Sequence, residues 1–293
     1  MRLRAVFNSI AAAAAAILLG PVAPAPAQTY PTRPITIIVP FAPGGGTDYA
    51  ARVLGPIMSQ KIGVAVVVEN VSGAAGNIAA QRVSRAEADG YTLLMHNIAF
   101  ALNAGFNPKT AFFPKDFTPI TMINSTPGVL VGRKDLPANS VKELVEYAKK
   151  NRLKLGHPGV GSNGHMSVSL MGQALGGLPA DLIPYRGGGP ALQDVISGQI
   201  DITSVVIANG VEPIASGQVK GVGVLSKKRH HLLPNVPSFF EDLNPISESL
   251  FWNVLLAPPK TPRAIVDKIN AAYEETIKDP RLLEIWTKSG TDL

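Results

Sequence analysis

The feature that most restricts the fold of this chain is a repeated alternation of short apolar strands, glycine-rich turns and helical patterns. Residues 35–39 are nearly all apolar, as expected of a strand that is buried on both faces of a parallel sheet. A glycine-rich turn at 43–48 leads into a helical pattern, and strands expected at 64–68 and 92–95 continue the rhythm. This alternation predicts a parallel α/β lobe in the first part of the chain.

A second α/β pattern begins near Thr126. Its first helix is marked by a capping box from Ser140 to Glu143. Thr261 is expected to cap the last helix, with Pro262 as the first helical residue. Further strands are expected at 153–156, 182–185, 200–206, 221–225 and 251–257. Two α/β patterns joined by loosely patterned segments predict two lobes that face a cleft.

The first residues are typical of a secretory signal peptide. Basic Arg2 and Arg4 precede an apolar run at 10–19, and a small-residue cleavage site ends at Ala27. A membrane-spanning helix needs about 20 apolar residues, roughly twice the length of this run. We therefore expect export to the periplasm, cleavage near Ala27 and a mature chain that begins at Gln28.

Composition excludes several classes of protein. The chain has no cysteine, which excludes disulfides, thiol nucleophiles and thiolate metal sites. Its hydrophobic content of 46% is enough for a core that holds without such links. The formal net charge of +6 becomes +4 without Arg2 and Arg4, and the basic residues are scattered. No nucleic-acid partner is expected without a basic stripe, whereas a mildly cationic surface attracts anionic solutes.

Two glycine-rich turns are suited to holding an anion, Gly44 to Thr47 and Gly159 to Ser162. Each is expected to lie between a strand and a helix, where the first helical N–H groups have no partner and the helix dipole is positive. A carboxylate or phosphate placed there finds ready donors. Either turn alone is slightly better explained as a tight corner. Together they favour an anion-binding cleft.

The second turn also matches the G-x-G-x-x-G pattern of dinucleotide sites, from Gly159 to Gly164. Such a site needs an acidic residue at the end of the next strand, about 20 positions further on. Asp181 has about this spacing, but it is expected to precede the strand at 182–185. Export also counts against a nicotinamide enzyme, so the sequence disfavours a dinucleotide site.

Catalytic and metal-binding patterns are weak. Ser162 and His165 are close in sequence, but the G-x-S-x-G elbow of a hydrolase is absent. Asp48 has two possible roles, as a general base or as a cap for the helix that it opens, and capping is favoured. The five histidines lack zinc-ligand spacing, and His230 and His231 are expected to point apart on a strand. We expect no catalytic residue, no metal and no cofactor.

At these residues the chain resembles the periplasmic binding proteins of tripartite tricarboxylate transport systems, the Bug or TctC-like receptors. The resemblance runs from about Tyr30 to Asp292, nearly the whole mature chain. The segments that carry it include VPFAPGG (39–45), DGYTLL (89–94), KDFTPI (115–120), GVGSNGH (159–165), PYRG (184–187), SGQID (197–201) and LPNVP (233–237).

The resemblance implies a type II periplasmic-binding-protein fold, a Venus flytrap of two α/β lobes joined by two crossover strands. The implied first lobe comprises residues 28–125 with 226–293, and the second comprises residues 126–225, after the signal peptide at 1–27. Members of the family typically continue past Leu293 with a strand and a final helix, so the C-terminal part of the first lobe is expected to be shortened.

The family's ligand loops fall on 41–48 in the first lobe and on 159–165 in the second. Turns at 72–77, 96–98 and 185–188 are expected to line the rest of the cleft. The expected ligand-binding residues are Phe41, Pro43, Gly44, Gly45, Gly46, Thr47, Asp48, Asn97, His157, Gly159, Gly161, Ser162, His165, Tyr185 and Gly187. His157 stands where the family usually has a serine. It either contacts the ligand, favouring a more acidic one when protonated, or packs against the turn.

The resemblance implies a receptor without enzymatic activity. Its expected partners are a small carboxylate, held on backbone N–H groups and bridging water, and the membrane permease subunits of a tripartite tricarboxylate-type transporter. The receptor is expected to be a monomer. The alternative is a sensor or scavenger that binds a similar ligand and serves a signalling partner.

Overall fold

The computed structural model describes residues 30–106, 114–174, 179–243 and 250–291. The expected signal peptide therefore lies outside the described residues. The chain divides after Thr32, and the elements all lie in the unit from Arg33 to Leu293. No helix among the described residues combines the length and apolar character needed to cross a membrane.

The first sheet is built around three parallel strands in the order β2-β1-β3. They are β1 (Ile35–Val39), β2 (Val66–Asn70) and β3 (Thr92–Asn97). Antiparallel strand β9 (Leu250–Ala257) pairs with β3 on one side and with β4 (Thr118–Arg133) on the other. Helix α2 (Gly46–Ile62) follows β1 and contacts both β2 and α10 (Arg263–Thr276).

The second sheet has the same parallel character. Strand β5 (Leu153–His157) pairs in parallel with β6 (Ala180–Pro184) and β7 (Ile202–Val206). Strands β7 and β8 (Val219–Val224) both pair antiparallel with the second half of β4. We call each sheet with its helices a lobe. The remaining helices are α3 (Asn77–Ser84), α4 (Ala99–Phe106), α5 (Val141–Ala148), α6 (Asn163–Ala174), α7 (Gly188–Ile196), α8 (Ile207–Ala215), α9 (Phe239–Leu243) and α11 (Pro280–Ser289), with 3₁₀ turns at Ala74–Gly76 and Pro114–Asp116.

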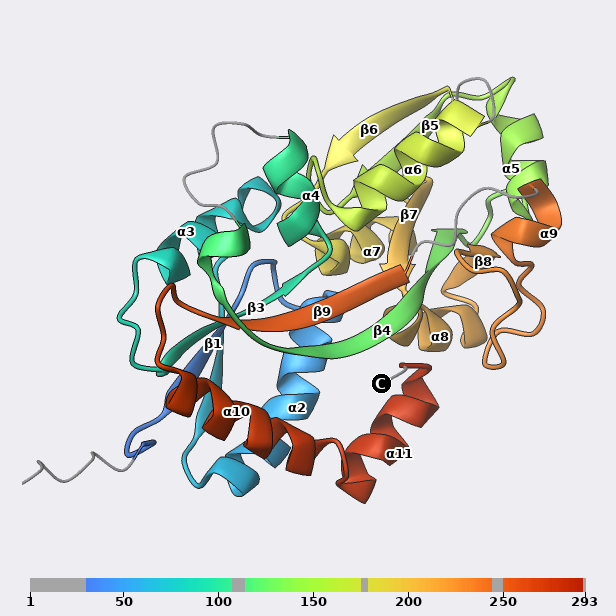
Figure 1. Cartoon of the computed structure of the whole chain (residues 1–293). Coiled ribbons are helices and arrows are strands. Elements are labelled where there is room, and N and C mark those ends of the chain that lie inside the picture. Colours follow the sequence, from blue (N-terminus) through green and yellow to red (C-terminus); the bar gives the residue numbers. More distant parts are fainter. Residues whose placement is uncertain (1–29, 107–113, 175–178, 244–249, 292–293) are drawn as a thin grey trace, which may run out of the picture. The chain divides into compact units, whose positions relative to one another are not determined.

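Strand β4 belongs to both sheets and is the first crossover between the lobes (Figure 1). Its residues 118–127 pair with β9, and residues 128–133 pair with β7 and β8. The chain returns from β8 through α9 and residues 244–249, which lie outside the described residues, and re-enters the first sheet as β9. The predicted two-lobe α/β fold is confirmed, whereas the exact lobe boundaries stay a prediction.

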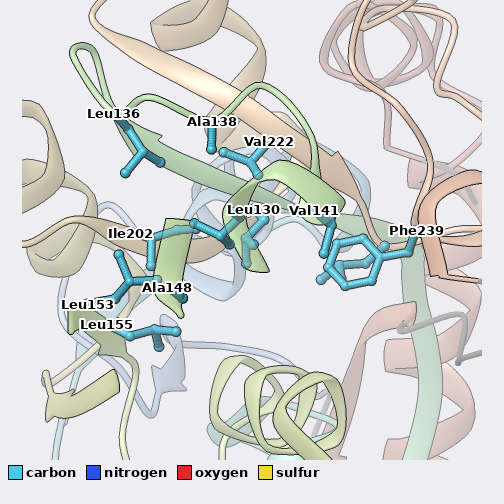
Figure 2. Close-up of a cluster of buried hydrophobic side chains, with 12 residues drawn as sticks. Leu130, Leu136, Ala138, Val141, Ala148, Leu153, Leu155, Ile202, Val222 and Phe239 are labelled. Carbon is cyan, nitrogen blue, oxygen red and sulfur yellow. The ribbon is translucent and has the colours of Figure 1, made fainter. Parts of the chain in front are cut away.

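One core cluster of the second lobe joins its sheet to helix α5 (Figure 2), and another joins the sheet to α7 and α8. Leu130, Leu155 and Ile202 come from three different strands and are almost fully buried. Helix α5 turns Val141 and Leu144 toward them because its N-terminus is fixed by Ser140, whose hydroxyl accepts from Glu143 N at 3.1 Å. The predicted cap is therefore present, although the Glu143 carboxylate accepts from Asn139 N instead of Ser140 N.

Two local expectations were wrong. Pro262, and not Thr261, is the N-cap of α10, because the Thr261 hydroxyl donates to the Pro258 carbonyl at 2.9 Å and is unavailable to the helix. His230 and His231 do not point apart on a strand. They lie in a turn after β8, with ring centroids 4.4 Å apart.

Candidate functional site

A cavity of about 50 Å³ lies where the two lobes meet, and both contribute to its wall. The first lobe supplies the start of α2 and the end of β3. The second supplies the start of α6 and the junction of β7 with α8. The lining residues are Phe41, Gly44, Gly45, Gly46, Thr47, Asn97, Gly128, Pro158, Ser162, Asn163, Gly164, Gly188, Ser204, Val205, Val206, Asn209 and Phe251.

The turn between β1 and α2 is held from behind by Asp48. The Asp48 carboxylate is buried and accepts hydrogen bonds from Gly44 N at 3.0 Å, Arg52 Nε at 3.0 Å and Asn70 Nδ2 at 2.8 Å. With Asp48 occupied in this way, the turn presents the first N–H groups of α2, from Gly46 onward, to the cavity wall. Asp48 is therefore not the expected cap of α2, whose N-cap is Gly45 with no side-chain hydrogen bond, but a positioning residue for the turn.

The turn between β5 and α6 is held by two histidines. Gly159 N donates to His157 Nδ1 at 3.2 Å, and Gly161 N donates to His165 Nδ1 at 3.4 Å. The two rings contact each other with centroids 4.8 Å apart. Ser162 closes the turn by accepting from His165 N at 3.2 Å. The start of α6 therefore faces the cavity, while the imidazoles lie behind it.

The lobes touch through hydrogen bonds to backbone carbonyls beside the cavity. Ala42 N donates to the Arg186 carbonyl at 2.9 Å, and Asn209 Nδ2 donates to the Gly44 carbonyl at 2.9 Å. Both bonds join a first-lobe loop to the second lobe. The cleft is therefore closed in this structure, which explains why the cavity is small.

A second, larger cavity of about 490 Å³ adjoins the first and shares Phe41 and Pro158 with it. Among the described residues of its wall there is one cation, Arg186, and no acidic residue. The other lining residues are Gly73, Ala74, Ala75, Asn77, Gly159, Val160, Pro184 and Tyr185. This space is suited to the part of a ligand that extends beyond the helix N-termini.

Most of the expected ligand-binding residues reach a cavity. Those on the first cavity wall are Phe41, Gly44, Gly45, Gly46, Thr47, Asn97 and Ser162, and those on the second are Phe41, Gly159 and Tyr185. Pro43, Asp48, His157, Gly161, His165 and Gly187 line neither cavity; of these, Asp48, His157 and His165 accept hydrogen bonds from the turns. Tyr185 is itself tethered, because its hydroxyl donates to Asp194 Oδ2 at 2.7 Å.

Sequence reasoning missed the part of the wall that comes from β7 and α8. Ser204 lies near the end of β7, and Asn209 lies in the first turn of α8. No glycine-rich turn separates this strand from its helix, so the pattern that marked the other two turns is absent. The one sequence feature that could have indicated this part of the wall is that Ile207 directly follows a buried strand. The residues after that strand lie at the same sheet edge as the other turns.

Burial lowers the pKa of both His157 and His165 below the usual value of an imidazole. Both rings are therefore neutral near neutral pH, with Nδ1 free of a proton and accepting from the turn. This geometry favours packing over ligand contact for His157. Among the described residues, no group of three His, Asp or Glu side chains is placed to hold a metal ion.

The histidine pair makes stability depend on pH. Because the folded pKa of His157 lies below its unfolded value near 6.5, the unfolded chain binds more protons just below that pH. We expect the wild-type Tm to fall between about pH 7.5 and 5.5 by more than the Tm of His157→Ser. His231→Ser, at an exposed position, should keep the wild-type slope. Identical slopes for all three proteins, measured by thermal melts, would show that His157 is not held neutral.

A two-lobed α/β chain that closes over a small cavity, with helix N-termini on both sides, has the architecture of a periplasmic solute-binding receptor. Residues 50–293 match the TctC family, the tripartite tricarboxylate transporter family receptor, and the chain belongs to this family. A UPF0065 protein of Agrobacterium vitis is 37% identical over 267 residues, which cover 90% of this chain and 77% of the relative.

Solved structures agree with this assignment. The periplasmic binding protein BugD superposes with a TM-score of 0.87 at 35% identity, covering 90% of this chain and 89% of BugD. MatC from Rhodopseudomonas palustris, solved with bound malate, gives a TM-score of 0.85 at 33% identity, covering 89% of this chain and 90% of MatC. The family prediction is therefore confirmed, and the family and fold are those of solute-binding receptors.

Proposed function

We propose that this chain is a periplasmic receptor, without enzymatic activity, that captures a small carboxylate between its lobes and delivers it to the permease subunits of a tripartite tricarboxylate-type transporter. The convergence of two helix N-termini on one cavity is the observation that carries this function. Helix α2 approaches from the first lobe and α6 from the second, so their positive dipole ends face the same small volume.

An anion in this position would favour the closed form. A ligand shifts a conformational equilibrium only by its difference in affinity for the two states. A carboxylate that contacts α2 and α6 together makes both sets of hydrogen bonds only when the lobes meet. Malate bound to MatC supports a carboxylate as the ligand class, and the family's description supports a transporter as the partner.

A thermal-shift screen of the purified chain against aliphatic, amino and aromatic carboxylates tests the binding function. A ligand at 100 times its Kd stabilises the folded state by about 2.7 kcal/mol. For a chain of this size the expected Tm rise is roughly 5–10 °C. A cooperative melt that no carboxylate shifts would contradict carboxylate binding.

Delivery to a transporter needs a separate test. Uptake of the carboxylate identified in the screen is expected to fall in cells that lack this chain and to return when it is restored. Normal uptake without the chain would contradict the transport role while leaving the binding role intact.

Fractionation should place a chain beginning at Gln28 in the periplasm, and recovery in the cytoplasm would contradict the proposed export.

A further inference from the structure

Asn209 lies on the cavity wall in the first turn of α8 and bridges the two lobes. Its Nδ2 donates to the Gly44 carbonyl at 2.9 Å. A backbone carbonyl can only accept, so the atom of Asn209 that faces it must be the amide nitrogen. This bond fixes the orientation of the amide and therefore the position of Oδ1.

Asn209 Oδ1 is buried and accepts no hydrogen bond from any described residue. On the wall of the first cavity the other side-chain amides and the capping hydroxyls have donors, whereas Asn77 Oδ1, on the wall of the second cavity, is also buried and unpaired. Thr47 Oγ1 accepts from Asn97 Nδ2 at 3.1 Å, and Asn97 Oδ1 accepts from Ala99 N at 3.0 Å. In the second lobe, Ser162 Oγ accepts from His165 N at 3.2 Å, and Asn163 Oδ1 accepts from Ser167 Oγ at 3.3 Å. Asn209 is thus the amide of the first cavity's described wall whose acceptor is unused.

Buried polar atoms in folded proteins almost always have a hydrogen-bond partner, because an unpaired one is costly. An ionised carboxylate offers only acceptors and cannot supply that partner. The two helix N-termini, in turn, offer donors that match the carboxylate. The wall is therefore complementary to a ligand that carries two kinds of group: a carboxylate that accepts from the helix N-termini, and a hydrogen-bond donor for Asn209 Oδ1.

Building on the function proposed above, we propose that Asn209 is a specificity-determining residue that accepts a hydrogen bond from a hydroxyl or amino group of the ligand. The receptor then selects hydroxy- or amino-carboxylates over the matched acids without the donor. Selection of this kind is strong in closed sites, because an analogue that lacks the donor leaves a buried acceptor unpaired. The bond from Asn209 to Gly44 links this recognition to closure of the lobes.

Matched pairs of acids that differ by one donor provide the test, by isothermal titration calorimetry on the full chain. Suitable pairs are malate and succinate, 2-hydroxyglutarate and glutarate, lactate and propionate, and mandelate and phenylacetate, with aspartate as the amino counterpart of malate. We expect the acid with the donor to bind at least about tenfold more tightly in the pair that fits the cavity.

Asn209→Ala is expected to reduce this preference to within about threefold. Loss of the bridge to Gly44 weakens both acids of a pair alike, so the ratio of the two Kd values isolates the contribution of Oδ1. Asn270→Ala makes the same chemical change on α10, where the Asn270 amide donates to Glu274, and should keep the wild-type ratio.

The outcomes separate this inference from the proposed function. Equal affinities within every pair that binds would overturn the role of Asn209 and leave carboxylate binding standing. A preference that survives in Asn209→Ala would assign donor recognition to another group and also overturn the inference. Failure of every acid to bind would overturn both. The wild-type ratio needs no variant, so equal affinities would overturn the inference even if Asn209→Ala does not fold.

Discussion

Gly189→Ala is expected to weaken ligand binding by roughly 10- to 100-fold while leaving each lobe folded. Gly189 lies in the first turn of α7 in the second lobe, against the first-lobe turn at Pro43 and Gly44. A Cβ at this position would lie 2.6 Å from the Pro43 carbonyl oxygen and 2.9 Å from the Gly44 carbonyl carbon. Both are backbone atoms that cannot rotate away, so the lobes must stay further apart.

The neighbouring Gly188→Ala is the matched control. A Cβ on Gly188 would have no atom within 4 Å, so the same added methyl leaves the contact between the lobes unchanged. Calorimetric Kd values for both variants, with circular dichroism to check folding, measure the difference. Because Gly188 itself lines the first cavity, the decisive comparison is with the wild type: an unchanged affinity in Gly189→Ala would mean that the ligand binds without the close approach seen at Gly189.

The local pattern was enough to predict most of the strands and the two glycine-rich turns, but it did not predict β4 (Thr118–Arg133). The apolar run at 35–39 and the glycines that follow it determine both the strand and the turn, and the structure has β1 and α2 there. The turn after β5 was predicted on the same basis. Residues that are adjacent in the sequence determine such features, so the features can be predicted from the sequence.

Side-chain roles within the turns were harder to predict, because they depend on which atoms lie behind the loop. His157 is the last residue of its strand, as Asn97 is, yet Asn97 reaches the cavity and His157 packs against His165. Asn209 belongs to the site only because β7 ends beside the turn at Gly44. That proximity joins residues 165 positions apart in sequence, which no local pattern encodes.

Asp48→Ala is expected to lower the free energy of unfolding by about 2–4 kcal/mol near neutral pH. The Asp48 carboxylate is buried, and its replacement removes the hydrogen bonds that it accepts from Gly44 N and Asn70 Nδ2, at about 1–2 kcal/mol each. The turn at Gly44 also loses its support, so ligand affinity should fall with stability. Asp267→Ala removes an exposed carboxylate paired with Arg263 and should change little.

The effect of Asp48→Ala should depend on pH in a defined direction. Burial raises the pKa of Asp48, but the hydrogen bonds from Arg52, Gly44 and Asn70 outweigh burial and hold the pKa below its ordinary value. A carboxylate with a lowered folded pKa stabilises the fold above its unfolded pKa of about 3.9, and this contribution is lost as the pH falls through the folded value. Urea unfolding should therefore give a constant gap between wild type and Asp48→Ala from about pH 6 to 8, and a narrowing gap below about pH 4. A gap that stays constant into acid would mean that Asp48 supports the turn through packing alone and not through its charge.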